Sequence, residues 1–113
     1  MTAAMAATTT AAAVRAGTQS ARATVQASLA TIAATDGRVN AFTAVLEERA
    51  LKRADLVDAS PRRSRMRLAG VPFAVKNLFD VAGIATLAGS KIEATAAPAR
   101  RDAVLVRRLE AEG

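Results

Sequence analysis

The stretch from Leu68 to Lys91 constrains the fold of this chain more than any other part of the sequence. Its proline, Pro72, fixes its own φ angle and biases the preceding residue toward an extended conformation. The apolar run Phe73–Val75 follows, a pattern typical of a strand buried on both faces. Lys76 comes directly after that run, although lysine is rarely buried. The sequence therefore predicts a buried strand that ends at a lysine.

Lys76 has two interpretations. A lysine acts as a base only when it is neutral, and desolvation at the end of a buried strand favours the neutral form. In that role it would accept a proton from a nucleophile and return it to the leaving group. In the other interpretation the side chain reaches solvent or pairs with Asp80. Spacing alone favours this second interpretation.

A longer motif around this lysine favours the catalytic role. Residues Gly70–Gly83, with Thr86 and Gly89–Ser90 behind them, resemble the catalytic-lysine segment of the amidase signature family. The resemblance implies a Ser–cis-Ser–Lys amidohydrolase that cleaves carboxamide C–N bonds, with Lys76 as the catalytic lysine. It also implies that both serines lie downstream, in a glycine- and serine-rich segment that residues 1–113 do not contain.

The resemblance extends with lower specificity from about Arg15 to Gly113. Asn40–Thr43 is similar to an Asn-Ala-Phe segment of the family, and 101–113 is similar to its following helix. Most members have Asp after the lysine, whereas this chain has Asn77. Phe73 and Asn77 together resemble the carboxybiuret-hydrolase-like branch.

The expected fold class is α/β. The resemblance implies that the chain supplies outer helices and a first core strand to a mixed sheet sandwiched between helices. Residues 1–17 are expected to be a flexible leader or a short helix, with 1–7 as an untethered terminus. Residues 18–113 are expected to be the N-terminal part of an amidase signature domain, truncated before the serine-containing segment.

Capping and breaking residues predict four helices. Gly17 ends the first, Ser20 caps the second, and Asp36-Gly37 is expected to stop the second. Ser60-Pro61 breaks the third, and Asp102 is expected to cap the last. The predicted helices span 8–16, 20–35, 46–59 and 103–112, and 39–45 is expected to be extended.

Other candidate sites are weaker. Ser90 lies in no Ser-x-x-Lys or Gly-x-Ser-x-Gly pattern, so we expect it to support its loop by local hydrogen bonds. The segment 83–91 fails as a phosphate loop because five residues separate its glycines and its serine precedes its lysine. Asp80 and Glu93 are isolated carboxylates, which are usually surface groups. No cofactor and no metal are expected.

Composition narrows the classes of partner. The chain lacks His and Cys, which excludes His-based triads, thiol nucleophiles and the usual zinc sites. Its net charge is +6, but the clustered arginines at 62–67 have no interleaved aromatic residues, which argues against nucleic acid. No apolar run approaches the length of a membrane span. A cytoplasmic location is expected, and a homodimer is compatible with the sequence.

The resemblance implies a function, hydrolysis of a linear amide by an enzyme of which this chain carries only the lysine. The predicted partners are a small amide substrate and the missing part of the amidase domain. Two alternatives remain open at this stage. One is the A subunit of a tRNA-dependent amidotransferase, and the other is a small basic helical binding module without catalysis.

Overall fold

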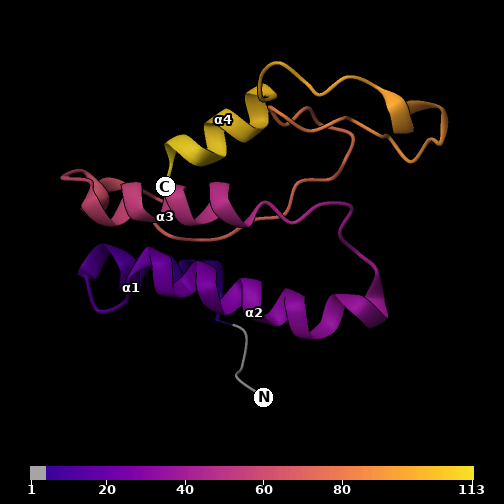
Figure 1. The fold of residues 1–113 in the computed structure, drawn as a ribbon. Coiled ribbons are helices and arrows are strands. Elements are labelled where there is room, and N and C mark those ends of the chain that lie inside the picture. The colour runs from indigo at the N-terminus through magenta and orange to yellow at the C-terminus, as the bar shows by residue number, and fades with distance from the viewer. Residues whose placement is uncertain (1–4) are drawn as a thin grey trace. The chain divides into compact units, whose positions relative to one another are not determined.

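A computed structural model describes residues 5–113 of the chain (Figure 1). The predicted untethered terminus, residues 1–7, lies largely outside these residues. The chain forms two compact units, which we describe separately. The first runs to Pro72 and includes Glu112–Gly113, and the second is Phe73–Ala111. The elements are α1 (Ala7–Ala16), α2 (Ala21–Val39), α3 (Glu47–Ala59), the 3-10 helices η1 (Arg63–Arg65) and η2 (Ile92–Thr95), and α4 (Val104–Ala111).

The junction between α1 and α2 confirms the predicted caps. Gly17 ends α1 in the left-handed conformation with φ 76°, and its N–H donates to the carbonyls of the last turn. A left-handed residue is the common way to end a helix, and glycine adopts it without steric cost. Ser20 then caps α2, because its Oγ accepts a hydrogen bond from the Ala23 N–H at 3.0 Å.

The predicted stop of the second helix at Asp36-Gly37 is wrong. Helix α2 continues to Val39 and ends at Asn40, which has φ 52°. A glycine inside a helix costs only about 1 kcal/mol relative to alanine, so it does not stop a helix by itself. Asp36 supports this end, since its carboxylate accepts from the Ala41 N–H at 2.7 Å. The segment predicted to be extended therefore begins after Asn40, as an irregular connection.

Helix α3 packs against α2. A side chain near the C-terminal end of α3 caps the N-terminus of α2. The Asp58 carboxylate accepts hydrogen bonds from the N–H groups of Ala21, at 2.7 Å, and Arg22, at 3.0 Å. The Arg22 guanidinium in turn forms an ion pair with Asp55 at 2.7 Å. A carboxylate at a helix N-terminus satisfies unpaired N–H groups and complements the helix dipole. Asp58 therefore ties the two helices together.

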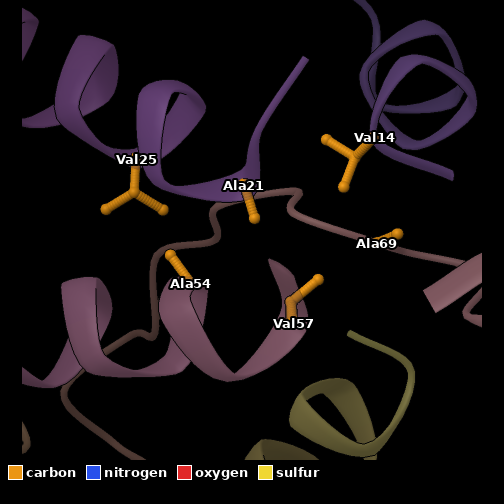
Figure 2. Packing of buried hydrophobic residues seen from close by; sticks show 6 residues of the cluster. All are labelled: Val14, Ala21, Val25, Ala54, Val57 and Ala69. Atoms are coloured by element: carbon orange, nitrogen blue, oxygen red, sulfur yellow. The ribbon is translucent and has the colours of Figure 1, made fainter. Parts of the chain in front are cut away.

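The core of the first unit is small and built from short side chains (Figure 2). Alanine and valine predominate, so the helices can approach closely but bury little apolar area per residue. Val14 is the largest side chain that is fully buried among the described residues. The buried members of this cluster are Val14, Ala21, Val25, Ala54, Val57 and Ala69.

The predicted strand at Phe73–Val75 is wrong for this chain. Residues 71–76 form neither helix nor strand, and the described part of the chain contains no strand. Phe73 is 44% exposed and Ala74 is exposed as well. A strand needs a neighbour for its N–H and C=O groups, and none of residues 5–113 provides one here. The α/β fold class thus describes the expected whole domain, whereas this part of it is helical.

The C-terminal helix matches its prediction within two residues. Helix α4 spans Val104–Ala111, inside the predicted 103–112, and buries Val106 at 2% exposure. Gly113 has φ 94°, a left-handed conformation. None of the helices formed by residues 5–113 combines the length and apolar character needed to cross a bilayer.

The arginine segment 62–67 is only partly exposed to solvent. Arg62 and Arg65 are exposed, but the Arg63 guanidinium donates to the Asp58 carbonyl at 3.3 Å. Arg67 forms a bidentate ion pair with Glu112, in which Nε donates to Oε2 at 2.9 Å and a terminal guanidinium nitrogen donates to Oε1 at 2.8 Å. The Leu68 N–H also donates to the Glu112 carbonyl at 2.9 Å. The end of the chain is thereby attached to the first unit.

This ion pair predicts a pH dependence of stability. The hydrogen bond from Arg67, with a smaller contribution from its charge, lowers the pKa of Glu112 below its usual 4.5. A carboxyl group with a lowered folded-state pKa stabilises the fold above its unfolded pKa, and this stability is lost as pH falls through the folded value. We expect Glu112→Gln to reduce the acid-side loss of stability measured by urea unfolding between neutral pH and about pH 3.

The matched control for this prediction is Glu48→Gln, which removes an exposed carboxylate on α3. The effect of Glu112→Gln on stability is expected to be small and to weaken as salt is added, because the Arg67 side chain of the ion pair is 79% exposed. The prediction fails if Glu112→Gln and the parent chain lose stability equally on acidification.

Candidate active site

Lys76 lies at the start of a tight turn in the second unit. Its carbonyl accepts hydrogen bonds from the N–H groups of Leu78, at 2.7 Å, and Phe79, at 3.1 Å. The side chain is exposed, and among residues 5–113 the ammonium has no hydrogen-bond or ion-pair partner. The expected desolvation by a buried strand is therefore not provided within the described chain. The proposed pairing with Asp80 is not formed either.

Asn77, the next residue, holds a second turn beside the first. Its side-chain Oδ1 accepts from the Leu87 N–H at 3.0 Å, and its backbone carbonyl accepts from the Ala88 N–H at 2.8 Å. The turn closes with a hydrogen bond of 2.8 Å from the Ser90 N–H to the Leu87 carbonyl. Asn77 thus connects the lysine segment to the turn at residues 87–90.

Asp80 and Asp102 act as hydrogen-bond acceptors within the loop. The Thr86 hydroxyl donates to Asp80 Oδ1 at 2.6 Å, and the Asp80 carbonyl accepts from the Ala103 N–H at 2.8 Å. Asp102 accepts from the Ala82 N–H at 2.8 Å. No group of three or more potential metal ligands gathers in residues 5–113. These contacts give the loop around Lys76 a defined backbone.

Backbone hydrogen bonds join the two ends of the loop. The Gly83 N–H donates to the Ala99 carbonyl at 2.9 Å, and the Ala99 N–H donates to the Ile84 carbonyl at 3.0 Å. Ser90 has the local role predicted for it, because its Oγ accepts from the Ile92 N–H at 3.2 Å. The expected support of the loop by Ser90 is confirmed.

Comparison with known proteins identifies the protein family to which the segment around Lys76 belongs. The family profile named Amidase matches residues 23–113, a range that contains Lys76 and the whole loop. The chain belongs to the amidase family. The motif at Gly70–Gly83 is thus part of a family match that extends over most of the chain.

Relatives in this family are much longer than this chain. It is 56% identical over 99 residues to AtzE, a 1-carboxybiuret hydrolase subunit from Pseudomonas sp. (strain ADP), covering 86% of this chain and 22% of that protein. It is 50% identical to the A subunit of glutamyl-tRNA(Gln) amidotransferase from Anaeromyxobacter dehalogenans (strain 2CP-C), covering 79% of this chain and 18% of that protein. The chain therefore spans about a fifth of the length of these relatives.

A solved structure of a relative has the same fold. It comes from work on a vestigial protein complex and the evolutionary origins of an s-triazine catabolic enzyme. It matches with a TM-score of 0.90 and 51% identity, covering 96% of this chain and 24% of that one. The resemblance to the carboxybiuret-hydrolase-like branch, expected from Phe73 and Asn77, agrees with these comparisons.

Sequence reasoning about this amidase-family loop missed the structural role of Asn77. We expected Asn77 only as a departure from the usual Asp. Asn and Asp side chains commonly accept hydrogen bonds from backbone N–H groups in turns, which was the available signal. The partner, Leu87, is ten residues away, so the sequence did not indicate where the bond would form.

Proposed function

We propose that this chain carries the general base of an amidase-family enzyme that hydrolyses a carboxamide to a carboxylate and an amine or ammonia. The observation that carries the proposal is the lysine motif Gly70–Gly83 inside a family match over residues 23–113. Lys76 is the residue of that motif to which we assign the base. The serine nucleophile and the oxyanion donors would come from polypeptide outside residues 1–113.

The proposed reaction needs a lysine that accepts and returns one proton. A serine oxygen bonds to the amide carbon, and its proton passes through the second serine to the neutral Lys76 amine. The C–N bond then breaks, and the proton returns to the departing nitrogen. Water hydrolyses the acyl-serine in a second round of the same transfers. No cofactor or metal takes part in this scheme.

Two named relatives suggest different substrates. The relative at 56% identity is named as part of a 1-carboxybiuret hydrolase, and the one at 50% as part of an amidotransferase. The higher identity and the s-triazine structure support the first, so we propose a small linear amide as the substrate class. Both names describe subunits, which supports action within a complex. The amidotransferase role is the second candidate.

We test the proposal with a chimera in which this chain replaces the matching 99-residue segment of the Pseudomonas sp. relative. We expect the chimera to hydrolyse the amide that the unaltered relative hydrolyses, and we expect residues 1–113 alone to show no amide hydrolysis. The reason is that acyl transfer needs a nucleophile, a base and oxyanion donors held in one geometry.

The unaltered relative and a chimera without the inserted segment are the controls. A folded chimera that fails to turn over the amide would contradict the proposed function. Activity of the isolated 113-residue chain above that of buffer would contradict our assignment of the nucleophile to other polypeptide. A chimera that instead hydrolyses only glutamine, in the presence of the other amidotransferase chains, would favour the second candidate.

A further inference from the structure

Both oxygens of Asn77 accept hydrogen bonds from the same short turn. The side-chain Oδ1 accepts from the Leu87 N–H at 3.0 Å, and the backbone oxygen accepts from the Ala88 N–H at 2.8 Å. Two consecutive N–H groups thus bind one residue, and that residue directly follows Lys76. A contact of this kind fixes the distance and the relative orientation of the two chain segments.

The turn itself is in a conformation that needs support. Ala88 has φ 47° and Gly89 has φ 69°, and the Ser90 N–H donates to the Leu87 carbonyl at 2.8 Å. Two central residues with positive φ and this closing bond define a type I′ turn. Glycine suits such a position, but alanine incurs a steric cost in the left-handed region. The hydrogen bonds to Asn77 offset the cost at Ala88.

The carbonyl group of Lys76 is also fixed by hydrogen bonds. The Lys76 carbonyl accepts from the N–H groups of Leu78 and Phe79, so the backbone that leaves Lys76 is bonded in two directions. The Lys76 side chain is exposed and has no hydrogen-bond or ion-pair partner among residues 5–113. The direction in which it leaves the backbone therefore depends on how the peptide between Lys76 and Asn77 is held.

We propose that Asn77 is a positioning residue for Lys76, acting by clamping the 87–90 turn through a side-chain acceptor. The proposal rests on the proposed function, because positioning matters only if Lys76 transfers protons. It assigns the positioning to the side-chain oxygen, which accepts the hydrogen bond from the Leu87 N–H. An aspartate, which offers an equivalent oxygen, is therefore a competent replacement, whereas a leucine of similar shape is not.

The kinetic test uses the active chimera with three substitutions. We expect Asn77→Leu to lower kcat by about 100-fold with little change in KM, because a misplacement of about 1 Å can cost that much. We expect Asn77→Asp to retain most of kcat. Thr86→Val is the matched control, since it removes another polar side chain that is hydrogen-bonded within the same loop. We expect it to have a much smaller effect.

A second measurement follows the clamp itself in the 113-residue chain, without any need for activity. We expect the amide hydrogen of Leu87 to exchange faster in Asn77→Leu than in the parent, and to remain protected in Asn77→Asp. This readout separates loss of the clamp from general unfolding, because the amides of α2 and α3 serve as an internal reference.

The outcomes separate this inference from the proposed function. An inactive parent chimera overturns the proposed function and the positioning role of Asn77 with it, whatever the exchange data show. An active chimera in which Asn77→Leu keeps its kcat overturns the positioning role alone. Equal losses in Thr86→Val and Asn77→Leu would also overturn it, since the effect would then belong to loop integrity. Unchanged exchange at Leu87 in Asn77→Leu would show that the clamp is not formed.

Discussion

Lys76→Ala is expected to reduce amide hydrolysis by the chimera about 100- to 10,000-fold, the range typical of a lost general base. We expect the substitution to remove the proton acceptor and to leave the fold unchanged, because the Lys76 side chain is exposed and has no hydrogen-bond or ion-pair partner among residues 5–113. The measurement is kcat/KM for the amide, with the helix signal in circular dichroism recorded beside it. Lys91→Ala, at a second exposed lysine of the same unit, is the matched control and is expected to retain activity.

Lys76→Arg distinguishes a base from a positive charge. A guanidinium keeps the charge but does not deprotonate in proteins, so it cannot accept the serine proton. We therefore expect a loss close to that of Lys76→Ala. If the arginine variant kept most of the parent rate, Lys76 would position substrate by its charge. The Ser–cis-Ser–Lys scheme would then lose its only residue in this chain.

The exposure of Lys76 bears on how that base would work. Lysine becomes a good base when its surroundings disfavour the ammonium form, and the described residues leave it in contact with solvent. Three large apolar side chains near it in sequence are also exposed: Phe73 at 44%, Leu78 at 52% and Phe79 at 42%. In the proposed whole enzyme these side chains would be covered together with Lys76. The same cover would then supply the desolvation that the sequence led us to expect.

Local signals in the sequence predicted the helices of this chain well. Gly17, Ser20 and Ser60-Pro61 act within one helical turn of their own position, through φ preference, capping or a missing N–H. The observed boundaries of α1, α3 and α4 lie within two residues of those predicted. The family motif Gly70–Gly83 around Lys76 was likewise readable, because the matching residues are contiguous.

Features that depend on distant residues were not predictable. The strand at Phe73–Val75 needs a neighbouring strand, which residues 5–113 do not include, so the same residues form no regular secondary structure. The cap on α2 comes from Asp58, whose position gives no sign of its partners at Ala21 and Arg22. The clamp by Asn77 is of the same kind. In each case the residue type was suggestive, but the partner was set by packing.

Gly70→Ala is expected to destabilise the first unit by roughly 2–5 kcal/mol, combining the cost of a left-handed alanine with that of overpacking. Gly70 has φ 67° and is buried between two helices. A Cβ atom there would lie 2.8 Å from Val14 Cγ2 on α1, and 2.9 Å and 3.0 Å from Ala21 Cβ and Cα on α2. Because Ala21 Cα is backbone, the two helices would have to separate. Figure 2 shows the Val14 and Ala21 side chains in this core.

Gly17→Ala separates conformational strain from steric clash at this site. Gly17 has φ 76°, close to that of Gly70, but a Cβ there would meet only the flexible end of Arg63, at 3.2 Å. We expect Gly17→Ala to cost about 1–2 kcal/mol, from strain alone. Urea unfolding followed by the helix signal measures both variants, and the core of small side chains leaves little stability to lose. The additional loss of stability expected for Gly70→Ala comes only from the close contact of Gly70 with Val14 and Ala21. Equal urea midpoints for the two variants would therefore show that α1 and α2 do not pack this closely against Gly70.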